Sequence, residues 1–282
     1  MSFKRIMQIK LNKICPDLYN SLIFLLKNKY ICNVKRPKTF NEKIQWRKKY
    51  QHDERYPFLV DKWEVRQFIK NKFPEILIPT FGVYDNPEDI NIEDLPERFI
   101  MKPTHGFGKV IICTDKSNID IDQMKQTVKS WFSYNQYLIT GEWQYKDLKS
   151  RVIVDKLIGE NIKDYKIFCF HGKPFAIQID SDRYLNHKRQ FRDIEWNKMD
   201  FRLAYPDDTT ELKKPKDLER ILAISKNLSK DFDFVRVDLF LVDGKIYFSE
   251  LTFTPGNGMD RFFPKEMDYV FGEKWLIKDR KK

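Results

Sequence analysis

The sequence predicts an α+β fold built from hairpins and amphipathic helices. The clearest hairpin runs from Val235 to Gly258, where two alternating apolar segments flank the turn pair Asp243-Gly244. A second pair of strands is predicted at 164–170 and 175–179, joined by a short turn. Residues 216–230 place leucines and isoleucines at helical spacing, which predicts a helix with one buried face.

Composition sets the size and the class of the protein. The chain has 282 residues, of which 41% are hydrophobic and 15% aromatic, so it is long enough for one large or two modest domains and is not disordered. The net charge of +11 is carried by residues 1–50, which hold thirteen Lys or Arg and two Asp or Glu. This placement indicates an anionic partner such as a membrane surface or an acidic polymer. We expect no nucleic-acid partner, because aromatic and basic residues do not interleave.

The four cysteines form no CxxC pair and fit no zinc spacing, which is typical of a reduced, cytoplasmic protein. The apolar run Leu18–Leu26 is too short to span a bilayer and lacks a small-residue cleavage site. We therefore predict neither a transmembrane helix nor a signal peptide.

Residues 1–35 are predicted to form basic helices, and leucines near residues 18–26 give one of them an apolar face. We expect this face to pack on the rest of the chain, with docking to a membrane or a partner as the alternative. Thr39 and Glu42 form a capping-box pattern, so a helix is predicted from Phe40 to about Tyr50.

Asp61 is expected to cap the next helix, with Lys62 in its first turn. A cation there opposes the helix dipole, so Lys62 either has no special role or points at a ligand. The remaining expected elements are strands at 99–103, 110–113 and 151–155, a helical region at 120–140 and a polar, mostly basic loop at 182–192.

Two carboxylates, Asp238 and Glu250, fall on the two strands of the clearest hairpin and are expected to face the same way. Mg²⁺ prefers such oxygen ligands, usually one or two carboxylates together with substrate phosphates. Arg236 projects to the same face, where a cation suits charge stabilisation during phosphoryl or acyl transfer. The alternative is an ordinary surface hairpin with an Arg–Asp pair.

Gly106 and Gly108 lie in a loop between two predicted strands, and Lys102 is on the strand that enters it. Backbone N–H groups of such a loop can close over phosphates. No helix follows the glycines, so the pattern is neither a P-loop nor a dinucleotide fingerprint. An ordinary hairpin loop is the alternative.

Five phrases occur in one order along the chain. They are Pro37-x-Thr39-Phe40-Asn41-Glu42-Lys43, Lys102-Pro103-Thr104-His105-Gly106, Asp164-Tyr165-Lys166, Val235-Arg236-Val237-Asp238 and Glu250-Leu251-Thr252-Phe253-Thr254-Pro255. Together they resemble the TupA-like branch of the ATP-grasp superfamily, which is found in teichuronopeptide and capsule biosynthesis. The resemblance covers about residues 37–276 and implies an ATP-grasp fold, with two α+β lobes enclosing ATP.

The resemblance implies ATP and Mg²⁺ as cofactors. Lys62 and Lys102 would bind the phosphates under a lid loop of Gly106, Phe107 and Gly108. The residues expected to surround the rest of the nucleotide are Asp155, Lys156, Leu157, Ile158, Glu160 and Asp164. The expected metal ligands are Asp238, Glu250 and Thr252. The expected catalytic residues are Arg236, Lys166 and Arg183.

The implied activity is an ATP-dependent carboxylate–amine ligase that forms an amide through an acyl phosphate. Its substrates would be an acidic sugar or peptide carboxylate of a cell-surface polysaccharide and an amine, either an amino acid or an amino sugar. The protein would be cytoplasmic, at the inner face of the membrane if the basic N-terminus binds there. We divide the chain into a basic helical segment, 1–55, and an ATP-grasp domain, 56–282, with a lid lobe at about 98–155 and a metal-binding lobe at about 160–282.

Three other functions stay open. The first is a glycosyltransferase that uses a nucleotide sugar, because Asp180-Ser181-Asp182 has the spacing of a metal-binding DxD motif. The second is a non-catalytic ATP-grasp-like protein that binds an anionic polymer. The third is a kinase that transfers phosphate without a second acceptor.

Overall fold

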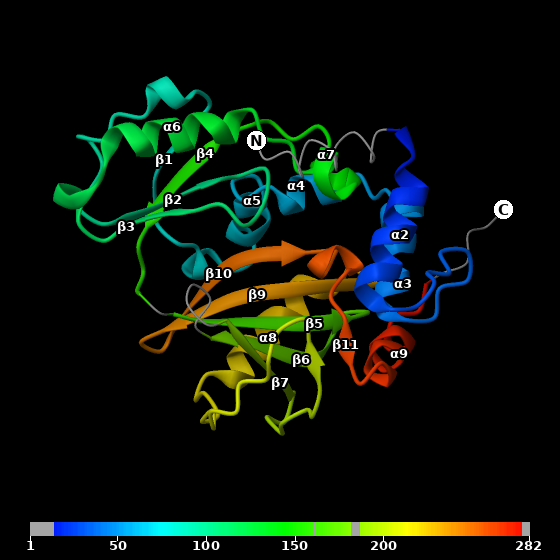
Figure 1. The fold of residues 1–282 in the computed structure, drawn as a ribbon. Coiled ribbons are helices and arrows are strands. Elements are labelled where there is room, and N and C mark those ends of the chain that lie inside the picture. The colour runs from blue at the N-terminus through cyan, green and yellow to red at the C-terminus, as the bar shows by residue number, and fades with distance from the viewer. Residues whose placement is uncertain (1–13, 161, 182–186, 278–282) are drawn as a thin grey trace. The chain divides into compact units, whose positions relative to one another are not determined.

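The computed structural model describes residues 14–160, 162–181 and 187–277 (Figure 1). These residues form two compact units, one from residue 53 to 160 and the other from the N-terminal segment up to residue 52 together with residues after 160. Each unit combines a mainly antiparallel sheet with helices, as expected for the α+β class. The predicted division at residue 55 stays a prediction.

The unit of residues 53–160 is built on a four-stranded sheet in the order β1-β4-β2-β3. Helix α6 packs on this sheet through Met124, Val128 and Trp131, which share a core with strand residues such as Phe99 and Val154. The strands are β1 (Thr80–Tyr84), β2 (Phe99–Pro103), β3 (Ile111–Cys113) and β4 (Val152–Lys156). The helices are α4 (Arg55–Val60), α5 (Val65–Lys70), α6 (Ile121–Phe132) and α7 (Tyr137–Thr140), with short 3₁₀ turns at Pro74–Ile76, Pro87–Asp89, Lys116–Asn118 and Trp143–Tyr145.

The second unit is built on a five-stranded antiparallel sheet in the order β10-β9-β5-β6-β7. Its strands are β5 (Lys163–Phe170), β6 (Lys173–Ser181), β7 (Lys188–Asp193), β9 (Phe234–Val242) and β10 (Lys245–Thr252). A small sheet pairs β8 (Arg202–Leu203) with β11 (Phe262–Phe263). The helices are α2 (Pro16–Asn28), α3 (Phe40–Tyr50), α8 (Leu218–Ser229) and α9 (Glu266–Lys274), with a 3₁₀ turn at Pro255–Gly258.

Alternation along the central strands separates two faces of this sheet. On β9, Phe234 belongs to an aromatic core with Phe40 of α3 and Phe271 of α9. Helix α8 contacts β5, β6 and β9. Arg236 and Asp238 follow Phe234 on β9 at two-residue spacing. Their polar side chains therefore project from the same face of the sheet as Phe234, beyond the aromatic core.

Helix α3 is fastened to its neighbours by polar side chains. The predicted capping box is present, with Thr39 accepting from the backbone N–H of Glu42 and the Glu42 carboxylate accepting from that of Thr39. Arg47 is buried, donates to the carbonyls of Phe234 and Phe253 and pairs with Asp233 at 2.5 Å. A buried cation is tolerated because its guanidinium donors are paired.

The contact between α3 and α9 requires a glycine. A Cβ at Gly272 would lie 2.1 Å from the carbonyl oxygen of Lys38 and 2.9 Å from the backbone nitrogen of Phe40. Only a residue without a side chain permits this approach of the two backbones.

Three local predictions were wrong. Asp61 was predicted to cap a helix with Lys62 in its first turn. Its carboxylate accepts from the backbone N–H groups of Trp63 and Glu64, but α5 starts only at Val65, so Lys62 lies outside the helix. The predicted loop at 182–192 contains the edge strand β7, because its Arg and Gln side chains find partners in the fold. Helix α2 buries Phe24 and Asn28 and leaves its leucine face exposed.

Asp268 of α9 gives the fold a pH-dependent stability. Its buried carboxylate accepts from the Tyr30 hydroxyl at 2.7 Å and from the backbone N–H of Asn41 at 2.9 Å, and Glu42 adds a like charge. Burial raises the pKa of Asp268 from 3.8 to about 6. Between these values the folded chain holds a proton that the unfolded chain has lost, so stability falls as pH rises through this window.

The Asp268→Asn variant is expected to remove this slope. Relative to the variant, the wild type should lose about 1–3 kcal/mol of unfolding free energy between pH 4 and pH 7. Urea denaturation at several pH values measures the difference. Glu266→Gln, an exposed acid on the same helix, should keep the wild-type slope. Parallel curves for wild type and Asp268→Asn would contradict the prediction.

Candidate active site

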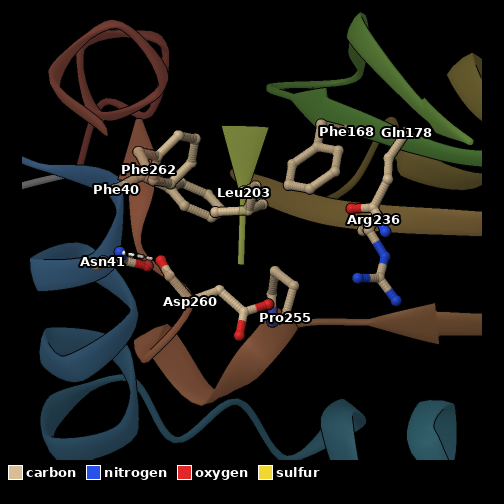
Figure 2. Close-up of a pocket in the computed structure, with 9 residues that line it drawn as sticks. All are labelled: Phe40, Asn41, Phe168, Gln178, Leu203, Arg236, Pro255, Asp260 and Phe262. Carbon is tan, nitrogen blue, oxygen red and sulfur yellow. Dashed lines mark hydrogen bonds between the residues drawn. The ribbon is translucent and has the colours of Figure 1, made fainter. Parts of the chain in front are cut away.

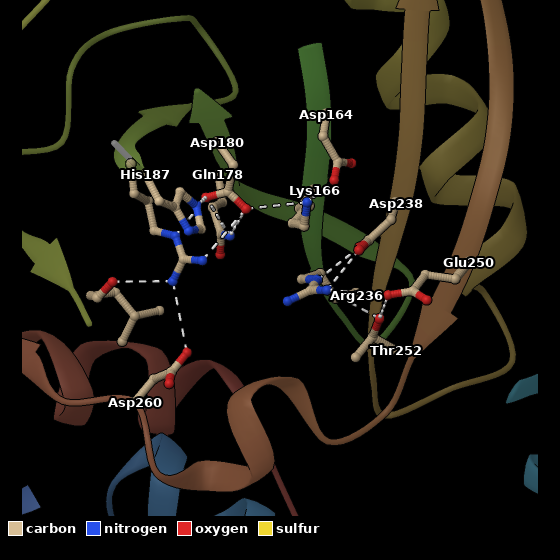
Figure 3. Close-up of polar contacts among 12 residues, drawn as sticks. Asp164, Lys166, Gln178, Asp180, His187, Arg236, Asp238, Glu250, Thr252 and Asp260 are labelled. Carbon is tan, nitrogen blue, oxygen red and sulfur yellow. Dashed lines mark hydrogen bonds and ion pairs between the residues drawn. The ribbon is translucent and has the colours of Figure 1, made fainter. Parts of the chain in front are cut away.

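A row of polar side chains crosses the five-stranded sheet at one level. Glu250 on β10 is paired with Asp238 on β9, Asp238 with Lys166 on β5, and Lys166 with Gln178 on β6. Residues directly opposite in adjacent antiparallel strands project from the same face. The sheet therefore gathers two acids, a lysine and an amide from four strands, with Asp164 and Asp180 paired two residues along (Figure 3).

Arg236 lies among the acids of the hairpin. Its guanidinium donates to both oxygens of Asp238, at 2.7 and 2.6 Å, and to the Thr252 hydroxyl at 3.2 Å. It also lies 3.7 Å from Glu250. The prediction that Asp238 and Glu250 face the same way with Arg236 beside them is confirmed, but a bulge decides it. The pairing shifts between Phe248 and Glu250, so Glu250 lies opposite Asp238, whereas unbroken alternation from the turn would have paired Asp238 with Ser249.

Burial governs the protonation of Asp238. The carboxyl is 1% exposed, and burial raises its pKa to about 7 although Arg236 and Lys166 oppose the shift. A further positive charge beside this carboxyl group would stabilise its ionised form and lower its pKa.

Asp180 is contacted by basic side chains on three sides. Arg189 contacts it at 2.7 Å, Lys166 at 3.2 Å and His187 at 3.3 Å. Burial alone would raise the pKa of Asp180, but Arg189 and Lys166 hold it well below its usual range. Lys166 also pairs with Asp164.

Asp180 is therefore a structural partner for cations, which disfavours its use as the first ligand of a DxD metal site. Asp182 and the predicted catalytic residue Arg183 lie outside the described residues.

The donor set fits Mg²⁺ in chemistry. Within the described cluster, three Lys and Arg cations accompany five carboxyl groups, so acids outnumber these cations. The Thr252 hydroxyl donates to Glu250 at 3.2 Å, and oxygen atoms of Asp238, Glu250 and Thr252 all lie around the Arg236 guanidinium. No group of three acids, histidines or cysteines is arranged around one point in the part of the chain that the structure describes. Mg²⁺ commonly needs only one or two carboxylates when phosphates complete its shell.

The unit of residues 53–160 carries the predicted phosphate-binding residues. Lys102 on β2 pairs at 3.0 Å with Asp155 on β4, whose carboxylate also accepts from the Thr80 hydroxyl at 2.6 Å. The Lys62 ammonium donates to the carbonyl of Gly106, which ties this lysine to the glycine loop although it lies outside any helix. Lys102 thus lies on the predicted strand, whereas Lys62 contacts the glycine loop from outside the helix in which it was predicted.

Most of the other residues predicted to contact the nucleotide lie in the glycine loop and at or just after the end of β4. Gly108 adopts a φ of +72° with open space around its Cα, and Phe107 is exposed. Lys156 and Glu160 are exposed, and Glu160 pairs with Arg98 at 2.6 Å. Leu157 and Ile158 are half-buried. The roles of these residues stay predictions.

Three residues of this region were not expected from sequence reasoning. Gln178, Arg189 and Asp260 join the cluster from β6, β7 and the segment after the Pro255–Gly258 turn. The signal for Gln178 was available, because it is a polar residue on an otherwise apolar predicted strand. Arg189 and Asp260 gave no local signal, since their places depend on long-range pairing.

Comparison with known proteins decides the family. The profile of the TupA-like ATP-grasp family matches residues 42–276, which is most of the chain. The chain belongs to the TupA-like ATP-grasp family. The recognition made from the five sequence phrases is thereby confirmed, as is the α+β ATP-grasp fold class. No curated protein matches the chain.

Solved structures of the superfamily show a distant similarity. D-alanine–D-alanine ligase from Bacillus anthracis, complexed with ATP, is 21% identical over 71% of this chain and 56% of its own, with a TM-score of 0.45. D-alanine–D-alanine ligase from Helicobacter pylori is 15% identical over 86% of this chain and 68% of its own, also with a TM-score of 0.45. The L-amino acid ligase from Bacillus licheniformis is 15% identical over 71% of this chain and 44% of its own, with a TM-score of 0.44. The chain spans little more than half the length of the first of these.

Proposed function

We propose that this TupA-like ATP-grasp protein is an ATP-dependent ligase that joins a carboxylate to an amine. The observation that carries the proposal is the polar row across the sheet, in which Asp238 lies opposite Glu250 with Arg236 and Lys166 beside them. Family membership supplies the nucleotide, and the cluster supplies acids and cations in the combination that acyl-phosphate chemistry needs.

The proposed reaction has two steps. A substrate carboxylate oxygen attacks the γ-phosphorus of ATP, the bond to the β–γ bridging oxygen breaks, and ADP leaves. The amine nitrogen then attacks the acyl carbon, the bond from this carbon to the phosphate oxygen breaks, and phosphate leaves while the nitrogen gives up a proton. Catalysis would be mainly positioning and charge stabilisation.

The chain's residues have distinct proposed roles. Lys62 and Lys102 bind phosphate oxygens, and Arg236 stabilises charge at the acyl centre. Asp238, Glu250 and Thr252 would hold Mg²⁺, which when bound neutralises phosphate charge. Lys166 and Arg183 are proposed as further catalytic cations. The proposed nucleotide residues are Gly106, Phe107, Gly108, Asp155, Lys156, Leu157, Ile158, Glu160 and Asp164.

Hydroxylamine provides the test, because it converts an acyl phosphate into a hydroxamate without the natural amine. The protein is incubated with ATP, Mg²⁺, hydroxylamine and one of several carboxylates: glucuronate, galacturonate or L-glutamate. We expect ADP and hydroxamate in equal amounts with one of them. Since a uronic acid or acidic peptide is the proposed substrate class, the absence of both products with every carboxylate in folded, ATP-binding protein would count against the ligase. ADP formed without hydroxamate would favour the kinase.

The polymer is proposed to be an acidic capsule or cell-surface polysaccharide, and the location to be cytoplasmic. The four cysteines are free thiols, which is typical of a reducing compartment. Among the described residues, no helix has the length and apolar content needed to cross a membrane.

We further propose that α2 docks on an anionic membrane surface. Its exposed face carries Leu18, Leu22, Leu25 and Leu26, whose exposed fractions range from 41% to 70%. Between Asp17 and Glu42 the chain holds five cations, all exposed, and no carboxylate. An apolar stripe continued by cations is typical of interfacial helices that bind anionic lipid. The expectation that this face packs on the rest of the chain is corrected by its exposure.

Flotation with vesicles tests this docking. Full-length protein should float with vesicles containing about one-third phosphatidylglycerol and much less with pure phosphatidylcholine, and added salt should release it. The double variant Leu22→Ser/Leu26→Ser should lose at least tenfold in partitioning. Leu276→Ser, which removes an exposed leucine elsewhere, should bind normally. Equal flotation of all three proteins would exclude α2 as the docking element.

A further inference from the structure

A small pocket borders the catalytic row within the second unit (Figure 2). Its cavity volume is about 10 Å³, which is room for one water-sized group, and it opens into a hollow of about 230 Å³ that includes open solvent. One part of its wall is apolar and comes from Phe40, Phe168, Leu203, Pro255 and Phe262. The polar part comes from Asn41, Gln178, Arg236 and Asp260. Of these four residues, only Arg236 has a role in the proposed reaction.

Gln178 presents an unused acceptor to this pocket. Its amide nitrogen donates to both oxygens of Asp180, at 3.1 and 3.0 Å, and Asp180 is itself held by Arg189. This anchoring determines the orientation of the amide, because the reverse orientation would place an oxygen against a carboxylate. The carbonyl oxygen Oε1 of Gln178 is buried and accepts no hydrogen bond from the described residues. Burying a hydrogen-bond acceptor without a donor costs free energy, so a ligand that donates a hydrogen bond to Oε1 would be favoured here.

Asp260 supplies a second acceptor across the pocket, as Figure 2 shows. Its backbone carbonyl is held by the Asn41 amide at 2.7 Å, which positions the residue, and its side chain keeps 34% exposure. Arg189 lies 3.7 Å from its carboxylate and compensates it only at long range. One amide oxygen and one carboxylate facing the same small space favour a group that carries several N–H donors and a positive charge.

We propose that this pocket binds the ammonium group of the amine substrate, with Gln178 Oε1 and the Asp260 carboxylate as its acceptors. The inference rests on the proposed ligase function and adds to it the class and the place of the second substrate. Arg236 connects the pocket with the row of polar side chains, because it lines the pocket and also donates to Asp238 of that row. An ammonium group bound here would lie beside the residue proposed to stabilise the acyl centre.

Saturation-transfer NMR can test the pocket without turnover. The probe is glycinamide, which carries an ammonium group and no carboxylate, and the matched control ligand is N-acetylglycinamide, which lacks the ammonium. Both are titrated into the full chain, with and without a non-hydrolysable ATP analogue and Mg²⁺. We expect glycinamide to bind and N-acetylglycinamide to bind at least tenfold more weakly.

Variants assign the binding to the two acceptors. Gln178→Leu and Asp260→Asn should each weaken glycinamide binding at least tenfold, while Asp260→Glu, which keeps a carboxylate on this side of the pocket, should retain it. Asp200→Asn, an exposed acid outside the pocket, should bind as the wild type does. Binding of the ATP analogue, measured by calorimetry, should stay within threefold in all four variants and shows that they are folded.

The outcomes separate the two proposals. ATP binding without a glycinamide signal, or a glycinamide signal that survives both Gln178→Leu and Asp260→Asn, overturns the pocket assignment and leaves the ligase proposal intact; an ordered water would then be the occupant of the Gln178 acceptor. Glycinamide binding that depends on Gln178 and Asp260, with no ATP binding, supports the pocket and contradicts the ligase.

Discussion

Replacing Arg236 with alanine is expected to lower kcat for amide or hydroxamate formation by about 10³-fold. The guanidinium contacts Asp238, Glu250 and Thr252 together, and it lies where the acyl phosphate is proposed to form. Its removal takes away charge stabilisation that matters most in the transition state, so kcat should fall far more than the affinity for ATP changes. Steady-state kinetics and calorimetry measure the two effects separately.

Two variants control for this experiment. Arg236→Lys keeps the charge but loses the fork that bonds both oxygens of Asp238, so it should recover only part of the rate. Arg202→Ala removes an exposed arginine of β8 and should leave kcat unchanged. A kcat for Arg236→Ala within threefold of the wild type would exclude Arg236 from the chemistry.

A related comparison addresses the glycosyltransferase alternative. A ligase should lose metal-dependent activity with Asp238→Ala, whereas a transferase that used Asp180-Ser181-Asp182 should lose it with Asp182→Ala.

The Lys102→Ala variant is expected to raise the Kd for ATP by about 10- to 150-fold, which corresponds to the loss of one or two charge-assisted contacts of about 1.5–3 kcal/mol in total. The lysine is only partly exposed and is held at 3.0 Å by Asp155, so it is preorganised and little side-chain entropy is lost when a phosphate binds. Calorimetry with Mg²⁺ present measures the effect.

Lys149→Ala is the matched control, since Lys149 forms an exposed pair with Asp85 at 2.8 Å in the same unit. It should bind ATP as the wild type does, because exposed pairs contribute little. Unchanged affinity in Lys102→Ala would remove this lysine from the nucleotide site. Because loss of Lys102 also leaves Asp155 with fewer partners, a thermal unfolding curve should accompany the binding measurement.

Much of the proposed site was predictable from local patterns. The Asp243-Gly244 turn has φ values of +49° and +73°, as a tight hairpin requires, and it pairs Val242 with Lys245 at the start of the two strands. The Thr39–Glu42 capping box likewise determined where α3 begins. These features depend on residues close in sequence, so periodicity and turn chemistry suffice to predict them.

Other features depended on the strand order and were not predictable. The sequence places β5 and β6 about seventy residues before β9, and nothing local indicates that Lys166 pairs with Asp238 or that Gln178 continues the row. Arg189 was expected in a loop, and its ion pair with Asp180 followed only from the pairing of β7 at the sheet edge.

The sequence by itself determined the family, the fold class and the turn of the hairpin that carries the acids, because short motifs and turn chemistry are local properties of the chain. Only the tertiary structure decided which strands are neighbours, that the leucines of α2 are exposed, and that Gln178 and Asp260 face one pocket. The physical reason is that sheet register and burial arise from packing between segments far apart in sequence, where the same local pattern is compatible with several partners.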